Sequence, residues 1–392
     1  MFDMSDWRGI LEAQIQMDPP ALSVDDAAEI YSNAPLNELM FVAMERRKNQ
    51  VPGNYVTYLI DRNINYTNVC TINCHFCSFY RSPGHKDSYT QTVDQISERI
   101  LELESVGGSR ILMQGGVNPS LPFEWYTDLL EELSRRHPKI SLDCFSPIEI
   151  EGISEVSGLS TMEVLSRFRE SGLHGLPGGG AEMLVDEVRN DVSPKKGSPD
   201  NWLRVMSEAQ SLGLITSATN VFGFGESIAD RIEHMRRVRD LQDKSVAEYK
   251  NGFTSFIAWP VQLENNTYGK RNRGQNKFEL GAGPSEYLRH IAISRLFFDN
   301  IDHIQASWPT MGLSVAQMAL LGGADDAGST MMEENVVSAS GTTKTLAGED
   351  ELQLTILRAG FIPQKRDSNY VYLDTKILHE KVIPCPPPLQ PA

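Results

Sequence analysis

Three of the five cysteines in this chain of 392 residues lie within one short stretch, NVCTINCHFCSFYR, at residues 68–81. Cys70, Cys74 and Cys77 follow the spacing C-x3-C-x2-C. Cysteines clustered in this way are more typical of metal ligands than of the disulfide framework of a secreted domain. Three thiolates can bind three irons of a [4Fe–4S] cluster and leave the fourth iron open to an exchangeable ligand.

The same group of cysteines is also compatible with zinc, for which His75 or His85 would supply a fourth ligand. Structural zinc sites usually combine two cysteine pairs, however, and the remaining cysteines, Cys144 and Cys385, stand alone in the sequence. When only the spacing is considered, a zinc site is therefore the alternative to an iron–sulfur cluster.

The composition argues against several classes of protein. The net charge is −16, whereas binding to nucleic acid calls for a basic patch, so we expect no nucleic-acid partner. No apolar run approaches the roughly 18 residues of a membrane span, and the N-terminal residues lack the basic region and apolar core of a secretory signal. These features predict a cytoplasmic protein with no membrane association.

Strand-like and helix-like patterns alternate along most of the chain. Two of the helical runs begin with capping boxes, Thr92 with Gln95 and Ser160 with Glu163. The strand-like runs are residues 58–68, 110–116, 139–146, 173–180, 214–225, 252–261, 303–308 and 324–328. Strict alternation favours parallel strands with right-handed crossovers, and eight such units predict an α/β fold of the (β/α)8 TIM-barrel type. An open doubly wound sheet is the alternative.

The chain divides into three predicted regions. We expect residues 1–50 to form an N-terminal helical cap, residues 51–375 to form the barrel with a C-terminal extension, and residues 376–392 to form a proline-rich tail. Polar and glycine-rich clusters follow most of the predicted strands, among them QGGVNP, GGGAE and SWPTMG. Because the carboxyl ends of barrel strands meet at one face, these clusters predict an active site there.

The pattern C-x3-C-x-F-C after the first predicted strand resembles the signature of the radical S-adenosylmethionine enzymes. The resemblance implies that Cys70, Cys74 and Cys77 hold a [4Fe–4S] cluster whose open iron binds S-adenosylmethionine. It also implies reductive cleavage of that cofactor to a 5′-deoxyadenosyl radical, which removes a hydrogen atom from a small-molecule substrate. The electron would come from a donor such as flavodoxin or ferredoxin.

Further residues match the positions at which this family contacts S-adenosylmethionine. They lie in the cysteine loop or at the ends of the second to fourth predicted strands: Phe76, Gln114, Gly115, Gly116, Ser146 and Glu182. The resemblance implies that the glycines let the backbone approach the methionine amino group closely. It implies that the serine and the glutamate face the methionine carboxylate or the ribose, and that the phenylalanine lies near the adenine.

Longer stretches narrow the resemblance within this family: IDRNINYTNVC, LPGGGAEMLVDEVR, DHIQASWPTMG and GSTMMEENVVSASGT. Together they resemble the cyclic dehypoxanthine futalosine synthases of the futalosine route to menaquinone. The resemblance implies that the radical removes the ribose C4′ hydrogen of dehypoxanthine futalosine, and that the resulting carbon radical adds to the benzoate ring. The aminofutalosine synthases, which share the GGGAE stretch, are the near alternative.

The implied reaction calls for groups that bind a benzoate, bind ribose hydroxyls and accept a proton. The candidates for the anionic benzoate are the cations Arg62, Arg189, Lys195 and Lys196. The candidates for the ribose are Asn65, Gln305, Ser307 and Thr310. The candidates for the proton acceptor are His174, Asp325, Asp326, Glu333 and Glu334. For each of these residues, a purely structural role is the alternative.

Overall fold

Ten parallel strands form a single sheet in the computed structural model, which describes residues 6–341, 344 and 346–378. In chain order the strands are β1 (Tyr55–Leu59), β2 (Asp61–Ile64), β3 (Arg110–Met113), β4 (Ser141–Cys144), β5 (Gly175–Leu176), β6 (Ile215–Phe222), β7 (Phe253–Pro260), β8 (His303–Gln305), β9 (Asp326–Ser329) and β10 (Ile362–Lys365). Their order in the sheet is β10-β1-β9-β8-β7-β6-β5-β4-β3-β2.

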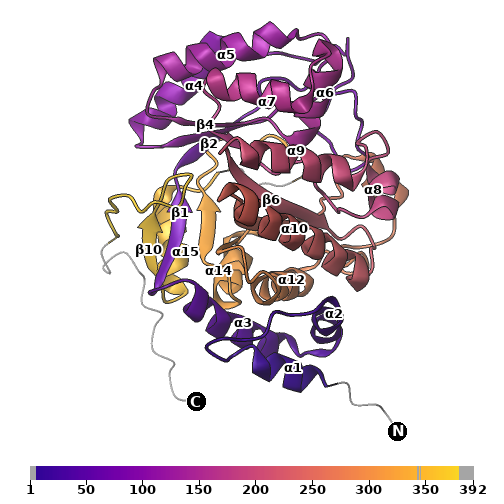
Figure 1. Cartoon of the computed structure of the whole chain (residues 1–392), viewed down its shortest axis with the longest axis vertical. Coiled ribbons are helices and arrows are strands. Elements are labelled where there is room, and N and C mark those ends of the chain that lie inside the picture. The colour runs from indigo at the N-terminus through magenta and orange to yellow at the C-terminus, as the bar shows by residue number, and fades with distance from the viewer. Residues whose placement is uncertain (1–5, 342–343, 345, 379–392) are drawn as a thin grey trace.

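The first strand of the barrel is split by Ile60 into two halves with different neighbours. Strand β1 pairs with β9 and β10, whereas β2, which follows it directly, pairs with β3. Because β1 and β2 are consecutive in the chain but lie near opposite ends of the sheet, the sheet has to curl round on itself (Figure 1). This arrangement confirms the predicted fold of the (β/α)8 TIM-barrel type.

Helices cover the outside of the curled sheet (Figure 1). Those of the barrel and its C-terminal part are α4 (Val93–Ser105), α5 (Phe123–Arg136), α6 (Pro147–Ser157), α7 (Thr161–Glu170), α8 (Asp186–Val192), α9 (Pro199–Ser211), α10 (Ile228–Tyr249), α11 (Thr267–Arg271), α12 (Pro284–Phe297), α13 (Trp308–Met311), α14 (Leu313–Leu321), the 3-10 helix η1 (Ser338–Ser340) and α15 (Glu349–Arg358). Both predicted capping boxes are present, at the starts of α4 and α7.

The N-terminal residues form helices α1 (Trp7–Ala13), α2 (Val24–Asn33) and α3 (Leu36–Gln50). Helix α3 packs on α12, and α2 packs on α10, where Arg231 donates a hydrogen bond of 2.7 Å to the Tyr31 hydroxyl. The division into a cap, a barrel and a tail stays a prediction, and the tail lies outside the described residues from position 379 onward. None of the described helices has the length and apolarity that crossing a membrane requires.

The segment after α15 was not predicted as part of the sheet. Strand β10 contains Pro363, which counts against a strand in the sequence but is tolerated here because β10 lies at the edge of the sheet. Beyond β10 the chain turns inward, so that Arg366, Ser368 and Tyr370 line the interior of the barrel. The C-terminal extension thus supplies part of the wall of the site.

Candidate active site

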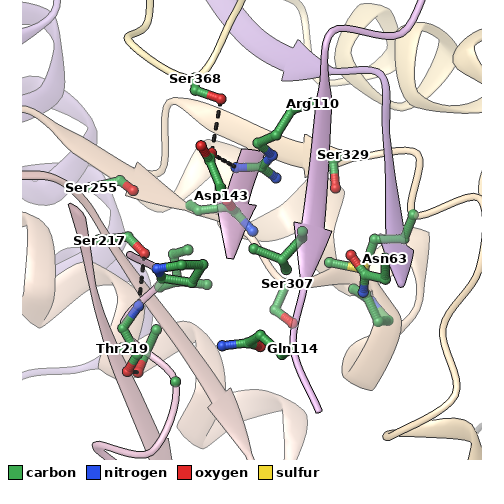
Figure 2. Close-up of a pocket in the computed structure, with 18 of the residues that line it drawn as sticks. Asn63, Arg110, Gln114, Asp143, Ser217, Thr219, Ser255, Ser307, Ser329 and Ser368 are labelled. Carbon is green, nitrogen blue, oxygen red and sulfur yellow. Dashed lines mark hydrogen bonds and ion pairs between the residues drawn. The ribbon is translucent and has the colours of Figure 1, made fainter. Parts of the chain in front are cut away.

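A cavity of about 230 Å³ occupies the interior of the barrel and is lined by alternate residues of the strands. Successive strand residues point to opposite faces, so Arg110 and Leu112 of β3 face inward and are followed by Gln114. Hydroxyl groups surround the remaining space, from Ser217, Thr219, Ser255, Ser307 and Ser329 (Figure 2). The lining is therefore rich in neutral hydrogen-bonding groups.

The four residues predicted to bind the ribose, Asn65, Gln305, Ser307 and Thr310, all line this cavity. Asn65 donates to the carbonyl oxygen of Gln114 at 2.9 Å. The hydroxyl of Ser307 lies 3.1 Å from that of Thr310, and Gln305 projects into the same space from the end of β8. The structure thus brings Asn65, Gln305 and Ser307 together beside Gln114.

The cysteine loop joins β2 to α4 and is fastened by its own backbone. The N–H of Cys70 donates to the carbonyl of Arg81 at 2.9 Å, and the N–H of Arg81 donates to that of Asn68 at 2.7 Å. The cysteines are free and partly exposed. Burial, followed by the charge of Cys74, raises the pKa of the Cys77 thiol to about 11. Metal binding would therefore have to release protons from this loop.

The two histidines that a zinc site would recruit make other contacts. His75 donates through Nδ1 to the carbonyl of Asp191 at 2.8 Å. His85 accepts through Nδ1 from the N–H of Asp87 at 3.1 Å. Backbone groups thus hold both rings, and neither of these contacts is with a cysteine.

The glycine motif after β3 rests on a buried carboxyl group, that of Glu149 in α6. The N–H of Gly115 donates to Glu149 at 2.9 Å, Ser146 donates at 2.5 Å, and the Tyr66 hydroxyl donates at 2.7 Å. Burial raises the pKa of Glu149 in spite of these hydrogen bonds. Ser146 therefore helps to hold the motif in place, in addition to any contact that it makes with a cofactor.

Gly116 is the point at which the glycine motif touches the cysteine loop. A Cβ atom at this position would lie 2.6 Å from the Cβ of Cys70 and would also collide with the carbonyl oxygen of Val69. Both neighbours belong to the segment that carries the first cysteine. Glycine is therefore required here by close packing as well as by any cofactor.

We expect Gly116→Ala to displace the start of the cysteine loop, at a cost of about 1–3 kcal/mol for overpacking. The iron bound per chain after anaerobic reconstitution should fall well below the wild-type value. Gly348→Ala is the matched control, because the nearest atom to its added methyl group, in Glu351, lies 3.9 Å away. Equal iron content in the two variants would show that this contact does not shape the loop.

Glu182, after β5, is a buried carboxylate between two cations, with Lys196 at one oxygen and Nη1 of Arg189 3.5 Å from the other. Its Oε1 accepts from Nζ of Lys196 at 2.5 Å, whereas its buried Oε2 makes no hydrogen bond to any described residue. Lys196 lies 5.6 Å from the centre of the Phe76 ring, which packs on Phe224 at 5.4 Å. Lys196 thus lies beside both Glu182 and Phe76, and the contacts of these two residues with the cofactor stay a prediction.

Arg189, predicted to bind the substrate, has a different position. It is only 2% exposed and donates to the carbonyl oxygens of Gly197, Gly180 and Ala181 at 2.8 to 2.9 Å. These hydrogen bonds occupy its guanidinium and brace the turn after β5. The structure therefore places Arg189 behind the site, as a support for the loop that carries Glu182.

Arg62 and Glu333 pair with each other on the outer face of β2. Arg62 donates to Glu333 at 3.1 Å and also pairs with Glu102 of α4. Arg99 donates to the same Glu333 oxygen at 3.0 Å. Since neighbouring strand residues face opposite ways, Asn63 is the one that lines the cavity. Arg62 was predicted to bind the benzoate, and Glu333 was predicted to accept the proton. In the structure the two residues neutralise each other away from the cavity.

Asp325 and His174 lie where strands begin, at the end of the barrel opposite to the predicted active face. Asp325 precedes β9, pairs with the buried Arg295, and accepts from His303 at 2.6 Å. His174 precedes β5 and is exposed, and its Nδ1 accepts from the N–H of Leu142 at 3.1 Å. Both residues were predicted as proton acceptors, and the structure gives both of them structural partners instead.

We expect Asp325→Ala to destabilise the fold by about 3–5 kcal/mol, because it leaves the fully buried charge of Arg295 without its partner. Burial alone would raise the pKa of Asp325, but Arg295 and His303 lower it to about 2. Its stabilising contribution is therefore present above the ordinary carboxyl pKa and is lost only as the pH falls toward 2. Urea unfolding at neutral pH measures the change, with the exposed Asp374→Ala as control.

A charged cluster inside the cavity was not predicted from the sequence. Asp143 of β4 accepts from the hydroxyl of Ser141 at 2.8 Å. It also accepts from the hydroxyl of Ser368 at 2.9 Å (Figure 2). Nη1 of Arg110 lies 3.8 Å from Asp143, while Nε of Arg110 donates to Asp61 at 3.2 Å. The available signal was a charged residue inside the otherwise apolar strand pattern ISLDCF.

Glu334 is the other carboxylate that lines the cavity within the described residues. Both of its oxygens accept hydrogen bonds from backbone N–H groups of the loop that follows. Among these, Oε1 accepts from Val337 and Oε2 accepts from Ser338, each at 2.9 Å. Burial raises the pKa of Glu334 despite these hydrogen bonds. Its carboxylate is thus committed to the shape of its own loop, whereas Asp143 keeps free lone pairs toward the cavity.

The chain is similar to known proteins along almost its whole length. It is 42% identical to the cyclic dehypoxanthine futalosine synthase of Halalkalibacterium halodurans over 367 aligned residues. The alignment covers 94% of this chain and 95% of that protein. It is 33% identical over 373 residues to the aminodeoxyfutalosine synthase of Thermus thermophilus, with 94% and 97% covered. The crystal structure of methylornithine synthase shares the fold, with a TM-score of 0.69 at 17% identity over 90% of this chain and 97% of that one.

The residues at the cysteine loop fit the cofactors of such a family. Three thiols, a glycine that allows close approach and a buried Glu182 oxygen that accepts no hydrogen bond from the described residues suit a cluster and a ligand with amino, carboxylate and hydroxyl groups. Once bound, these cofactors supply a 5′-deoxyadenosyl radical. Residues 64–238 match the Radical SAM superfamily, and residues 250–378 match the CofH/MqnC C-terminal region. The chain therefore belongs to the radical S-adenosylmethionine enzymes, in the group with this C-terminal region, and its cofactors are a [4Fe–4S] cluster and S-adenosylmethionine.

Proposed function

We propose that this enzyme converts dehypoxanthine futalosine to cyclic dehypoxanthine futalosine, a step in menaquinone biosynthesis. The observation that carries the proposal is the 42% identity, over nearly the full length of both chains, to a relative of that name. The cavity supports it, because amides and hydroxyls line its walls, as a substrate that carries a ribose requires.

In this proposal Asn65, Gln305 and Ser307 hold the ribose beside the glycine motif. Their amide and hydroxyl groups lie next to Gln114, and thus next to the predicted position of S-adenosylmethionine. The site would hold the ribose with its C4′ hydrogen toward the cofactor and the benzoate ring behind C4′. The two carbons that form the new bond would then start from a near-attack geometry. The closed barrel wall would exclude water from the radicals.

The proton acceptor in this proposal is Asp143. Addition of the ribose radical to the ring forms one carbon–carbon bond. The ring recovers its aromaticity only when it loses a proton to a base and an electron, which would return to the cluster that cleavage of S-adenosylmethionine leaves oxidised. Of the described carboxylates that line the cavity, Glu334 is committed to backbone N–H groups, whereas Asp143 accepts only one hydroxyl at each oxygen. Asp143 therefore takes the role first assigned to His174, Asp325 or Glu333.

Aminofutalosine synthase is the second candidate, because the relative of a closely similar name from Thermus thermophilus matches over 94% of this chain. The two activities differ in their substrate. One test is to incubate anaerobically reconstituted enzyme with dithionite, S-adenosylmethionine and either dehypoxanthine futalosine or an enolpyruvyl benzoate. We expect only the first to be consumed, with a cyclised product. Consumption of the enolpyruvyl benzoate, with dehypoxanthine futalosine untouched, would contradict the proposal.

A further inference from the structure

We propose that a basic surface beside the cysteine loop is the docking site for an acidic electron-carrier protein that reduces the cluster. This basic surface consists of four exposed cations, Lys195, Lys270, Arg271 and Arg273. The proposal depends on the [4Fe–4S] cluster at Cys70, Cys74 and Cys77 but not on the identity of the substrate. It names the surface on which the required electron enters.

The charge of this surface is opposite to that of the chain. The chain carries a net charge of −16, yet residues 267–277, TYGKRNRGQNK, contain four basic residues and no acidic one. An acidic carrier would be repelled by most of such a molecule and attracted to this segment. Complementary potentials of this kind steer association and set its orientation.

The basic surface directly contacts the loop that holds the cysteines. The N–H of Tyr268 donates to the carbonyl of His75 at 2.7 Å, so the basic segment is bonded to a residue between two of the cysteines. On the other side, Nζ of Lys195 lies 3.5 Å from the carbonyl oxygen of Thr71. In Figure 1 this corner of the molecule is marked by α8, whose Asp191 pairs with Arg271.

Three aromatic rings in contact connect the cysteine loop to the basic surface. Phe76, beside Cys77, packs on Phe224 with 5.4 Å between ring centres. Phe224 packs edge-on against Tyr268 at 5.3 Å, and the guanidinium of Arg271 lies 5.1 Å from the Tyr268 ring. A carrier seated on Arg271 would therefore be connected to the cysteine loop by the continuous contacts of Tyr268, Phe224 and Phe76.

Most of the positive charge is not neutralised within the chain. Arg271 pairs with Asp191, and Glu264 and Glu279 flank the segment in the sequence. Within the described residues, however, no acidic side chain pairs with Lys195, Lys270 or Arg273. Phe278, which directly follows residues 267–277 in the sequence, is 70% exposed and adds an apolar contact area. Cations without acidic partners suit the acidic rim of a small carrier protein.

The test compares a protein reductant with a small one. Wild-type enzyme and the double variant Lys270→Glu/Arg273→Glu are reconstituted, and 5′-deoxyadenosine formation is followed with either photoreduced flavodoxin or dithionite as reductant. We expect the flavodoxin-driven rate at low salt to fall about tenfold or more, since steering by charge changes association rates by this order. The dithionite-driven rate should stay at the wild-type value, because dithionite needs no docking surface.

Two further variants keep the proposal falsifiable. Lys139→Glu/Lys244→Glu makes the same change of charge at two exposed positions on the opposite side of the barrel and should leave both rates unchanged. Lys270→Gln/Arg273→Gln removes the charges without reversing them and should give an intermediate loss. The proposal is overturned if flavodoxin reduces the charge-reversed variant as fast as the wild type, or if the rates with flavodoxin and dithionite fall to the same extent.

Discussion

An asparagine in place of Asp143 is expected to lower formation of the cyclised product by about 10²–10⁴-fold, the usual contribution of a positioned proton acceptor. The substitution keeps the size of the side chain and its ability to bond Ser141 and Ser368, so the cavity should keep its shape. Radical formation happens before the proton is lost. Cleavage of S-adenosylmethionine should therefore continue, and 5′-deoxyadenosine should accumulate without a matching amount of product.

The measurement is the ratio of product to 5′-deoxyadenosine under anaerobic conditions, determined for each variant by mass spectrometry. The control is Asp374→Asn, an exposed aspartate after β10, which should leave the ratio at the wild-type value. Ser368→Ala should give a smaller loss than Asp143→Asn, because it removes one hydroxyl from the carboxylate and leaves the carboxylate in place. A wild-type ratio in Asp143→Asn combined with a collapsed ratio in Glu334→Gln would assign the proton to Glu334.

The sequence could predict the features whose signal is local. Cys70, Cys74 and Cys77 lie in one loop, so their spacing alone limits the chemistry. The alternation of strand and helix patterns was enough for the barrel, because each unit is a contiguous run. The position of Asn65, Gln305 and Ser307 at the cavity could be predicted for the same reason, since a polar residue at the end of a barrel strand lies at the active face, whereas their contact with substrate stays a prediction.

The errors concern residues whose position depends on long-range geometry. Asp143 and Ser368 are separated by 225 positions in the sequence. The segment that carries Ser368 enters the barrel after the edge strand β10, which is hard to recognise in the sequence because it contains Pro363. Asp325 falls inside the predicted strand 324–328, but β9 begins at Asp326, so Asp325 precedes the strand and its carboxylate belongs to the opposite end. A one-residue strand boundary decides the face in such a case, and strand boundaries are the least certain part of any sequence prediction.

Arg189 illustrates a second limit. The GGGAE part of its motif was predicted to lie at the active face, and a cation nearby was a reasonable partner for a benzoate. What the guanidinium binds depends on which carbonyl oxygens the loop leaves without partners. Gly180, Ala181 and Gly197 all direct theirs at Arg189. An arginine has several donors, and a turn with unpaired carbonyls can occupy all of them before a ligand arrives.

Cys77→Ala is expected to abolish cleavage of S-adenosylmethionine and to remove most of the iron from the reconstituted protein. In our prediction each of the three cysteines supplies one of the thiolates of the cluster, and the fourth iron has to stay open for the cofactor. Removal of one cysteine would leave two irons, instead of one, without a protein ligand. Iron per chain, visible absorbance and 5′-deoxyadenosine formation with dithionite measure the three consequences independently, and Cys70→Ala and Cys74→Ala should behave alike.

Cys144→Ala is the matched control, because this thiol is buried in β4 and packs in the hydrophobic core. Burial raises the pKa of Cys144 well above its ordinary value, which makes it a poor metal ligand. Its loss should cost about 1 kcal/mol of stability and leave the iron content unchanged. If Cys77→Ala kept its iron and its cleavage activity, the cluster would need another protein ligand. The contacts that Gly116 makes with Val69 and Cys70 would then have to be explained without a cofactor beside them.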